Sequence, residues 1–101
     1  MGMKFYQTSY AYAGSQRIAA GSTSVLSAQT ADDVETLRIA PTVDVWMNHG
    51  SSTVTAQSSV GQVTSTFHPA GVVEYFNTRD RFFAVIANSS TGLVNLTEIT
   101  Q

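Results

Sequence analysis

The residues that could carry acid–base or metal chemistry in this chain are His49, His68, Asp44 and Glu74. The two histidines do not follow a metal-binding spacing such as His-x-His or i, i+4. Neither has an evident aspartate or glutamate to orient it, and no Gly-x-Ser-x-Gly elbow offers a serine nucleophile. We therefore expect no catalytic residue, no bound metal and no cofactor, and we predict that the protein is not an enzyme.

Other common functional motifs are also missing from the sequence. The chain has no cysteine, so disulfides, thiol catalysis and cysteine-ligated zinc are excluded. Asp32-Asp33 lacks the further oxygen ligands that calcium needs, and we interpret it as a solvated loop or a helix start. A net charge of −2 with scattered basic residues gives no footprint for nucleic acid. No apolar run approaches the roughly 18–20 residues of a membrane span. We expect no nucleic-acid, membrane or small-molecule partner.

The composition instead favours a protein that packs against other proteins. Only 12% of the residues are charged, about half the usual share. Serine and threonine replace the missing charges, which leaves a surface with little self-repulsion. Such a surface suits a protein held permanently against copies of itself or other partners.

Hydrophobic residues alternate with polar ones in "VETLRIAPTVDVWMN". The apolar residues at odd positions are Leu37, Ile39, Val43, Val45 and Met47. This period of two is typical of strands with one buried face. Pro41 interrupts the pattern and predicts a bend or a sheet edge, because proline has no N–H to donate. Asn48-His49-Gly50 predicts a turn at the end of the segment.

The second half predicts three more strands. Pro69-Ala70-Gly71 predicts a turn that leads into "GVVEYFN", a strand of the core. "RFFAVIAN" is apolar on both faces, as expected at the centre of a sandwich, and "LVNLTEIT" closes the chain. Residues 50–66 predict a long loop or weak hairpin, and "AQTADDVETL" has room for one short helical turn. Glu74 is expected to pair across strands with Arg79 or Arg81.

The predicted fold is therefore all-β, a small antiparallel β-sandwich or jelly-roll-like barrel with an N-terminal arm or edge strand. We divide the chain into residues 1–14, an N-terminal aromatic segment, and residues 15–101, a single β-sandwich domain. Those first residues form either an edge strand that packs its own aromatic rings or an arm that docks on a neighbouring subunit. Trp46 lies on the polar face of its strand, so it is either an exposed anchor or covered by the second sheet. The candidate interface residues are Phe5, Tyr6, Tyr10, Tyr12, Trp46 and His68.

A family resemblance adds to these residue-level expectations. It rests on the stretches "SQRIAAGSTSVLSA", "TLRIAPTVDVWMNHG", "HPAGVVEYF", "RFFAVIA" and "TGLVNLTEIT", which fall within roughly residues 15–100. The most specific pieces are Pro69-Ala70-Gly71 before Glu74-Tyr75-Phe76, and Leu96-Thr97-Glu98. On these residues the chain resembles small bacteriophage virion proteins. It departs from them at His68, where that family usually has an aliphatic residue, and at Phe82-Phe83, where the strand usually begins with more charge.

The resemblance implies a structural β-domain on the phage particle. The function expected from it is capsid decoration: a non-enzymatic cement protein that binds and stabilises the shell of the major capsid protein. Its partners would be the major capsid protein and copies of itself, possibly as a trimer. It would be made in the host bacterial cytoplasm and lie on the capsid surface of the virion. The alternatives are a tail, neck or fibre component or, from another class, a small carbohydrate-binding module with exposed Trp or Tyr platforms.

Overall fold

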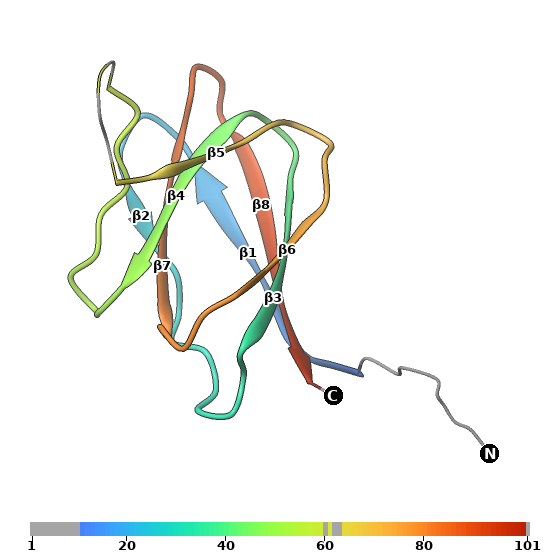
Figure 1. The fold of residues 1–101 in the computed structure, drawn as a ribbon. Coiled ribbons are helices and arrows are strands. Elements are labelled where there is room, and N and C mark those ends of the chain that lie inside the picture. The colour runs from blue at the N-terminus through green and yellow to red at the C-terminus, as the bar shows by residue number, and fades with distance from the viewer. Residues whose placement is uncertain (1–10, 60, 62–63, 101) are drawn as a thin grey trace.

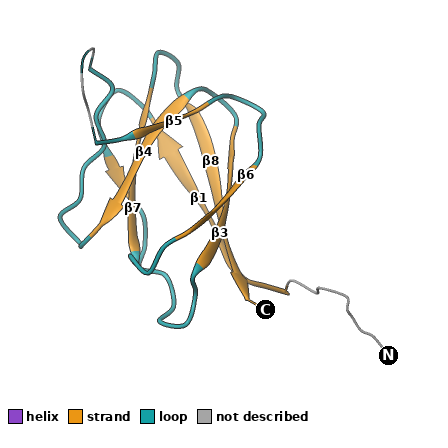
Figure 2. Ribbon diagram, in the orientation of Figure 1, coloured by secondary structure: helices purple, strands orange, loops and turns teal. Residues whose placement is uncertain are grey.

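The computed structural model describes residues 11–59, 61 and 64–100, which form eight strands and no helix (Figures 1 and 2). The strands are β1 (Ala11–Ala20), β2 (Val25–Leu26), β3 (Thr36–Pro41), β4 (Val45–Gly50), β5 (Thr66–His68), β6 (Glu74–Asn77), β7 (Phe82–Ala87) and β8 (Gly92–Thr100). One antiparallel sheet has the order β1-β8-β3-β6 and the other the order β2-β7-β4-β5. The two sheets pack together, so the predicted all-β sandwich is confirmed.

The alternating sequence pattern sets the core between the sheets. Leu37 and Ile39 of β3 are fully buried, and so is Val45 of β4. Strand β7 pairs with β2 on one side and β4 on the other, and both Phe83 and Val85 are buried there. The prediction of an apolar central strand is therefore confirmed for β7.

Pro41 ends β3, and the chain then crosses from one sheet to the other through residues 42–44 before β4 begins. The bend predicted at this proline is confirmed. The turn predicted at Asn48-His49-Gly50 is wrong, because these residues continue β4 and pair with β7 as far as Gly50 opposite Phe82. Backbone pairing with a long neighbouring strand outweighs the local turn preference of Asn and Gly.

The connection between β2 and β3 contains no helical turn. Val34 N donates to Ala31 O at 3.3 Å, which closes a single tight turn around Asp32-Asp33. Strand β1 begins at Ala11, before the boundary that the sequence suggests between residues 14 and 15, and it forms one edge of its sheet. Residues 1–10 lie outside the described part of the chain.

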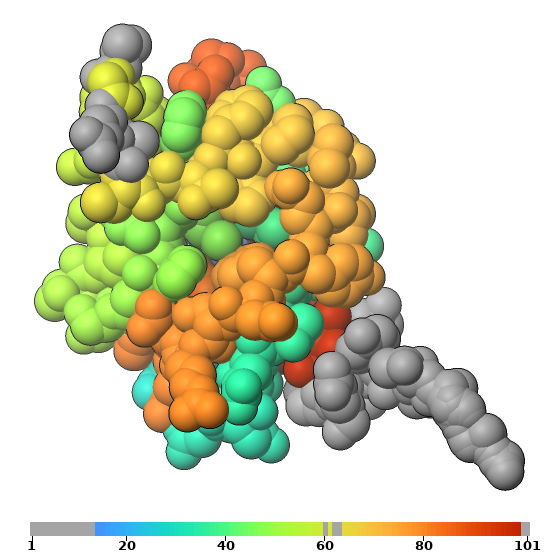
Figure 3. Space-filling view, viewed as in Figure 1, coloured from blue at the N-terminus to red at the C-terminus, as the bar shows by residue number. Residues whose placement is uncertain are grey.

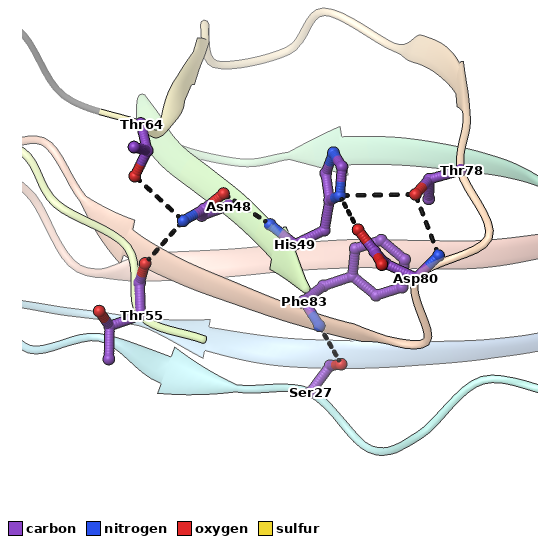
Figure 4. A network of polar contacts seen from close by, with 8 residues as sticks. All are labelled: Ser27, Asn48, His49, Thr55, Thr64, Thr78, Asp80 and Phe83. Atoms are coloured by element: carbon purple, nitrogen blue, oxygen red, sulfur yellow. Dashed lines mark hydrogen bonds and ion pairs between the residues drawn. The ribbon is translucent and has the colours of Figure 1, made fainter. Parts of the chain in front are cut away.

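The loop between β4 and β5 is held by side-chain hydrogen bonds. Asn48 Nδ2 donates to Thr55 O at 3.1 Å and to Thr64 Oγ1 at 3.2 Å (Figure 4). Ala56 N donates to Ser24 Oγ at 2.9 Å, and the Ala56 side chain is buried. The predicted loop is confirmed, and in its described part asparagine, serine and threonine side chains hold it to the body.

Residues 69–73 carry the chain from β5, at the edge of one sheet, to β6, at the edge of the other. Gly71 has φ = 75°, a left-handed conformation that glycine adopts without steric cost. Gly71 N donates to Pro41 O at 2.9 Å, and Ala70 N donates to Asp44 Oδ1 at 2.7 Å. The predicted turn is confirmed. The strand that it leads into is an edge strand and not a core strand, because β6 pairs only with β3.

Candidate interaction surface

Exposed apolar side chains gather on the segment that includes β5 and the start of β6. Within the described residues, six large hydrophobic side chains are exposed, and four of them belong to this segment. These four, Phe67, Val72, Val73 and Tyr75, are called here the β5–β6 surface. Tyr75 is the most exposed of them, at 58%. Figure 3 shows the segment, in yellow and orange, spread over the face turned to the viewer. Such a cluster is typical of a protein–protein contact.

The β5–β6 surface lacks the charges that usually protect a sheet edge. Between Asp44 and Arg79 the only formally charged residue is Glu74. Soluble proteins commonly place lysine or other charged side chains on edge strands, because the unpaired backbone groups there can recruit another chain. Glu74 protects the edge only in part, because its carboxylate is held by His68. In the β3–β6 ladder Arg38 is the partner of Tyr75, so one cationic side chain adjoins this surface from β3. The segment itself presents mainly apolar side chains.

His68 lies beneath this surface and joins the two sheets. Its side chain, on β5, is only 8% exposed, and its Nδ1 lies 2.6 Å from Oε1 of Glu74 on β6. A carboxylate can only accept, so Nδ1 carries the proton that it donates. The Nε2 atom is buried and has no hydrogen-bond partner among the described residues. His68 thus supports the β5–β6 surface from within and does not contribute its own side chain to it.

Two expectations about charged partners are wrong. Both histidines have an orienting carboxylate, Asp80 for His49 and Glu74 for His68, whereas none was expected from the sequence. Glu74 pairs with His68 and not with an arginine, since Arg79 lies 3.8 Å from Glu35 and Arg81 pairs with Asp32. The turn at 69–71 redirects the chain between sheets, so a residue only six positions along faces His68 across the sandwich.

The difference in burial between His68 and Glu74 predicts unequal effects of mutation. Glu74→Ala leaves the buried Nδ1–H of His68 without an acceptor, which should lower the free energy of unfolding by about 1–3 kcal/mol. His68→Leu leaves only a carboxylate that is 44% exposed and that water can solvate, so its effect should be smaller. Urea unfolding of the purified variants measures both.

The double variant is the control for this prediction. In the His68→Leu background no buried donor remains, so Glu74→Ala should change the stability by less than about 0.5 kcal/mol. An equal loss from Glu74→Ala in both backgrounds would show that the His68 contact contributes nothing.

Trp46 lies beside the β5–β6 surface, on the outer face of its sheet. Its neighbours Val45 and Met47 point into the core, so the indole points away from the second sheet. It is half-buried and contacts Phe67, with ring centroids 5.2 Å apart. The indole N–H donates to Asn88 Oδ1 at 3.0 Å. Trp46 is therefore neither fully exposed nor covered by the second sheet.

His49 occupies a separate position near the end of β4. Its Nδ1 lies 2.7 Å from Asp80 Oδ2 and 3.5 Å from Thr78 Oγ1 (Figure 4). Its ring stacks on Phe76, with centroids 6.1 Å apart. On β4, His49 is four residues from Val45, the residue opposite His68, which corresponds to about 13 Å. The two histidines and their carboxylates therefore do not converge on one site. Among the described residues, no three His, Cys, Asp or Glu side chains come together as a metal site would require.

The other predicted interface residues are mostly beyond the described part. Phe5, Tyr6 and Tyr10 fall outside it. The backbone of Tyr12 pairs with Ile99 in the β1–β8 ladder, while its side chain is not among those described. The β5–β6 surface was missed by the sequence reasoning, although the run of Val72 and Val73 after a glycine turn was visible there.

The chain was compared with protein families, curated proteins and solved structures. No protein-family model, no curated protein and no solved structure was found to match the chain. In the described residues, no helix has the length and hydrophobicity that crossing a membrane requires.

Proposed function

We propose that the protein is a bacteriophage capsid decoration protein that binds the shell of the major capsid protein and stabilises it without catalysis. The observation that supports the proposal most is the β5–β6 surface, which is exposed and mainly apolar, with Glu74 as the one formally charged residue of its segment. The resemblance to small phage virion proteins supplies the partner. Its most specific piece, Pro69-Ala70-Gly71 before Glu74-Tyr75-Phe76, lies within this same segment.

The mechanism follows from burial of that surface. A protein that binds only the assembled shell stabilises it by mass action. Val72, Val73 and Tyr75 would lose their exposure to water in the contact, and tyrosine is among the residues that dominate binding energy at interfaces. Many copies on one particle multiply the effect, and contacts between copies, as in a trimer, would add avidity.

The free edges of β5 and β6 offer a second contribution to the same contact. Each is the outermost strand of its sheet, so one side of its backbone has no partner strand among the described residues. A segment of the capsid protein in an extended conformation could pair there by main-chain hydrogen bonds. The left-handed Gly71 and the His68–Glu74 contact fix the position of both edges beforehand, which lowers the entropy lost on binding.

The proposal is tested on purified virions of the phage that encodes the chain. Mass spectrometry of the separated head and tail fractions should find peptides of this protein in the heads, in many copies. Particles made without the protein should assemble but release their DNA at a lower temperature. Detection in tails alone would favour a tail, neck or fibre component, and absence from the virion would overturn the proposal.

A further inference from the structure

The two ends of the sandwich differ in their polar residues: one is rich in charged side chains, whereas at the other Asp44 adjoins turns without charge, its backbone O accepting from Asn88 N at 2.9 Å. One end is formed by residues 30–35 and 78–81, and it concentrates the charges (Figure 1). Its ion pairs are Arg79–Glu35, Arg81–Asp32 and His49–Asp80. The other end is formed by the turns at 21–24 and 88–91 together with residues 57–59. None of those three segments contains a formal charge, and their side chains are almost all hydroxyls and amides.

A hollow of about 240 Å³ opens between these three neutral segments. Its lining includes Gly21, Ser22, Ser58, Asn88, Ser90 and Thr91. Hydrogen bonds fix the segments relative to one another: Ala87 N donates to Gly21 O, and Ala56 N, next to the third segment, donates to Ser24 Oγ, both at 2.9 Å. The hollow is therefore a formed feature at the meeting point of three loops, the place where β-sandwich proteins commonly bind ligands.

The side chain of Asn88 is oriented within this wall. The indole N–H of Trp46 is a donor only, so the amide atom that it contacts at 3.0 Å must be the oxygen of Asn88. The Nδ2 group, with two donor hydrogens, is then on the other side of the amide. Trp46 is not part of the lining, and its role is to hold the Asn88 amide in this orientation. An oriented amide and several hydroxyl groups are thus combined at one site.

The chemistry of this lining selects the class of ligand. An anion would call for arginine or lysine and a metal ion for carboxylates, and the lining contains none of these. Carbon atoms, including those of Ala87, share the lining with the hydroxyl and amide groups, which suits a ring that carries both C–H and O–H groups better than a wholly apolar ligand. The hydroxyl and amide groups can both donate and accept hydrogen bonds, which matches the hydroxyls of a sugar. A volume below the roughly 300 Å³ of drug-sized sites fits one sugar ring and not a long oligosaccharide.

We propose that the hollow binds a single uncharged monosaccharide unit, such as the terminal residue of a glycan. Asn88 Nδ2 donates to a sugar hydroxyl, and the serine and threonine hydroxyls exchange hydrogen bonds with others. This site uses neither the β5–β6 surface nor its partner. A particle protein with both features would hold the shell with one side and offer the other end to glycans.

The experiment is an NMR titration of the full chain, labelled with ¹⁵N, with glucose, galactose, mannose, N-acetylglucosamine and N-acetylgalactosamine. At least one of these sugars should give saturable shifts in the millimolar range, confined to residues 21–22, 58, 88–91 and the Trp46 indole. Asn88→Asp is the decisive variant because it keeps an oxygen for the Trp46 N–H but removes the amide donor. It should raise the Kd at least about tenfold.

Ser52→Ala is the matched control, since Ser52 lies in an exposed part of the β4–β5 loop outside the lining. It should leave the Kd unchanged. The proposal would be overturned if none of the five sugars gave saturable shifts, if the shifts lay elsewhere, or if Asn88→Asp bound as well as the wild type. Preserved dispersion of the amide spectrum shows that each variant is folded. The assay contains no capsid, so a negative result would not count against the decoration proposal. Likewise, absence of the protein from virions would not count against sugar binding.

Discussion

Replacement of Phe83 with alanine is expected to lower the free energy of unfolding by about 3–5 kcal/mol. Phe83 is the largest fully buried side chain among the described residues, and its ring packs edge-on against Phe76 with centroids 5.9 Å apart. Its backbone N–H donates to Ser27 Oγ at 3.0 Å, which limits how far the strand can move to fill the cavity (Figure 4). A domain of this length has a total stability of roughly 5–15 kcal/mol, so the substitution should remove a large share of it.

Phe82→Ala is the matched control for this prediction. The two phenylalanines are adjacent in β7, but Phe82 points to the opposite face and is only half-buried. Phe82→Ala should lower the free energy of unfolding by clearly less than Phe83→Ala, on the order of 1 kcal/mol. Urea unfolding followed by circular dichroism gives both values. Equal losses for the two variants would mean that the core does not lie between the sheets in the way described.

The second large effect is expected at the β5–β6 surface. Tyr75→Ala should weaken binding of the protein to capsids that lack it by about thirtyfold or more, as expected for a tyrosine at the centre of an interface. Val73→Asp should have at least as large an effect, because it places a charge in a contact that would exclude water. Co-sedimentation of the purified variants with such capsids, over a range of protein concentrations, measures the change in affinity.

Leu93→Asp and Leu26→Asp are the controls for surface chemistry. Their exposed fractions, 40% and 41%, are close to the 43% of Val73, but they lie on β8 and β2, away from β5 and β6. Neither change should alter the affinity for the shell. If they weakened binding as much as Val73→Asp, the contact would not be specific to the β5–β6 surface. If neither Tyr75→Ala nor Val73→Asp weakened binding, the β5–β6 surface would be excluded as the contact.

The fold class could be predicted from the sequence because local pattern and tertiary burial agree. The alternation around Leu37 and Ile39 is reproduced as buried positions of β3. The limits of strands were harder to predict. Residues 48–50 have turn propensity, yet they pair with β7, a partner more than thirty residues away in the sequence. Local preference cannot reveal such pairing, since its energy comes from a strand that a short window does not contain.

The candidate site was less accessible to sequence reasoning for the same physical reason. His68 and Glu74 are six residues apart, but their contact depends on β5 and β6 belonging to different sheets. His49 and Asp80 meet only because the β6–β7 turn returns to the end of β4. Val72 and Val73 are exposed because they lie in the connection that joins the edge strands of the two sheets. Periodicity shows that a residue belongs to a strand, and it does not show where that strand lies in the sheet.

The central claim, that the β5–β6 surface attaches this protein to a phage capsid, is tested most directly by a cryo-electron microscopy map of purified virions. We predict density for the eight-stranded sandwich on the outside of the head shell, with Val73 and Tyr75 buried against the major capsid protein and the turn at 88–91 facing solvent. A shell without this density, or a sandwich attached with Val73 and Tyr75 in solvent, would contradict the account.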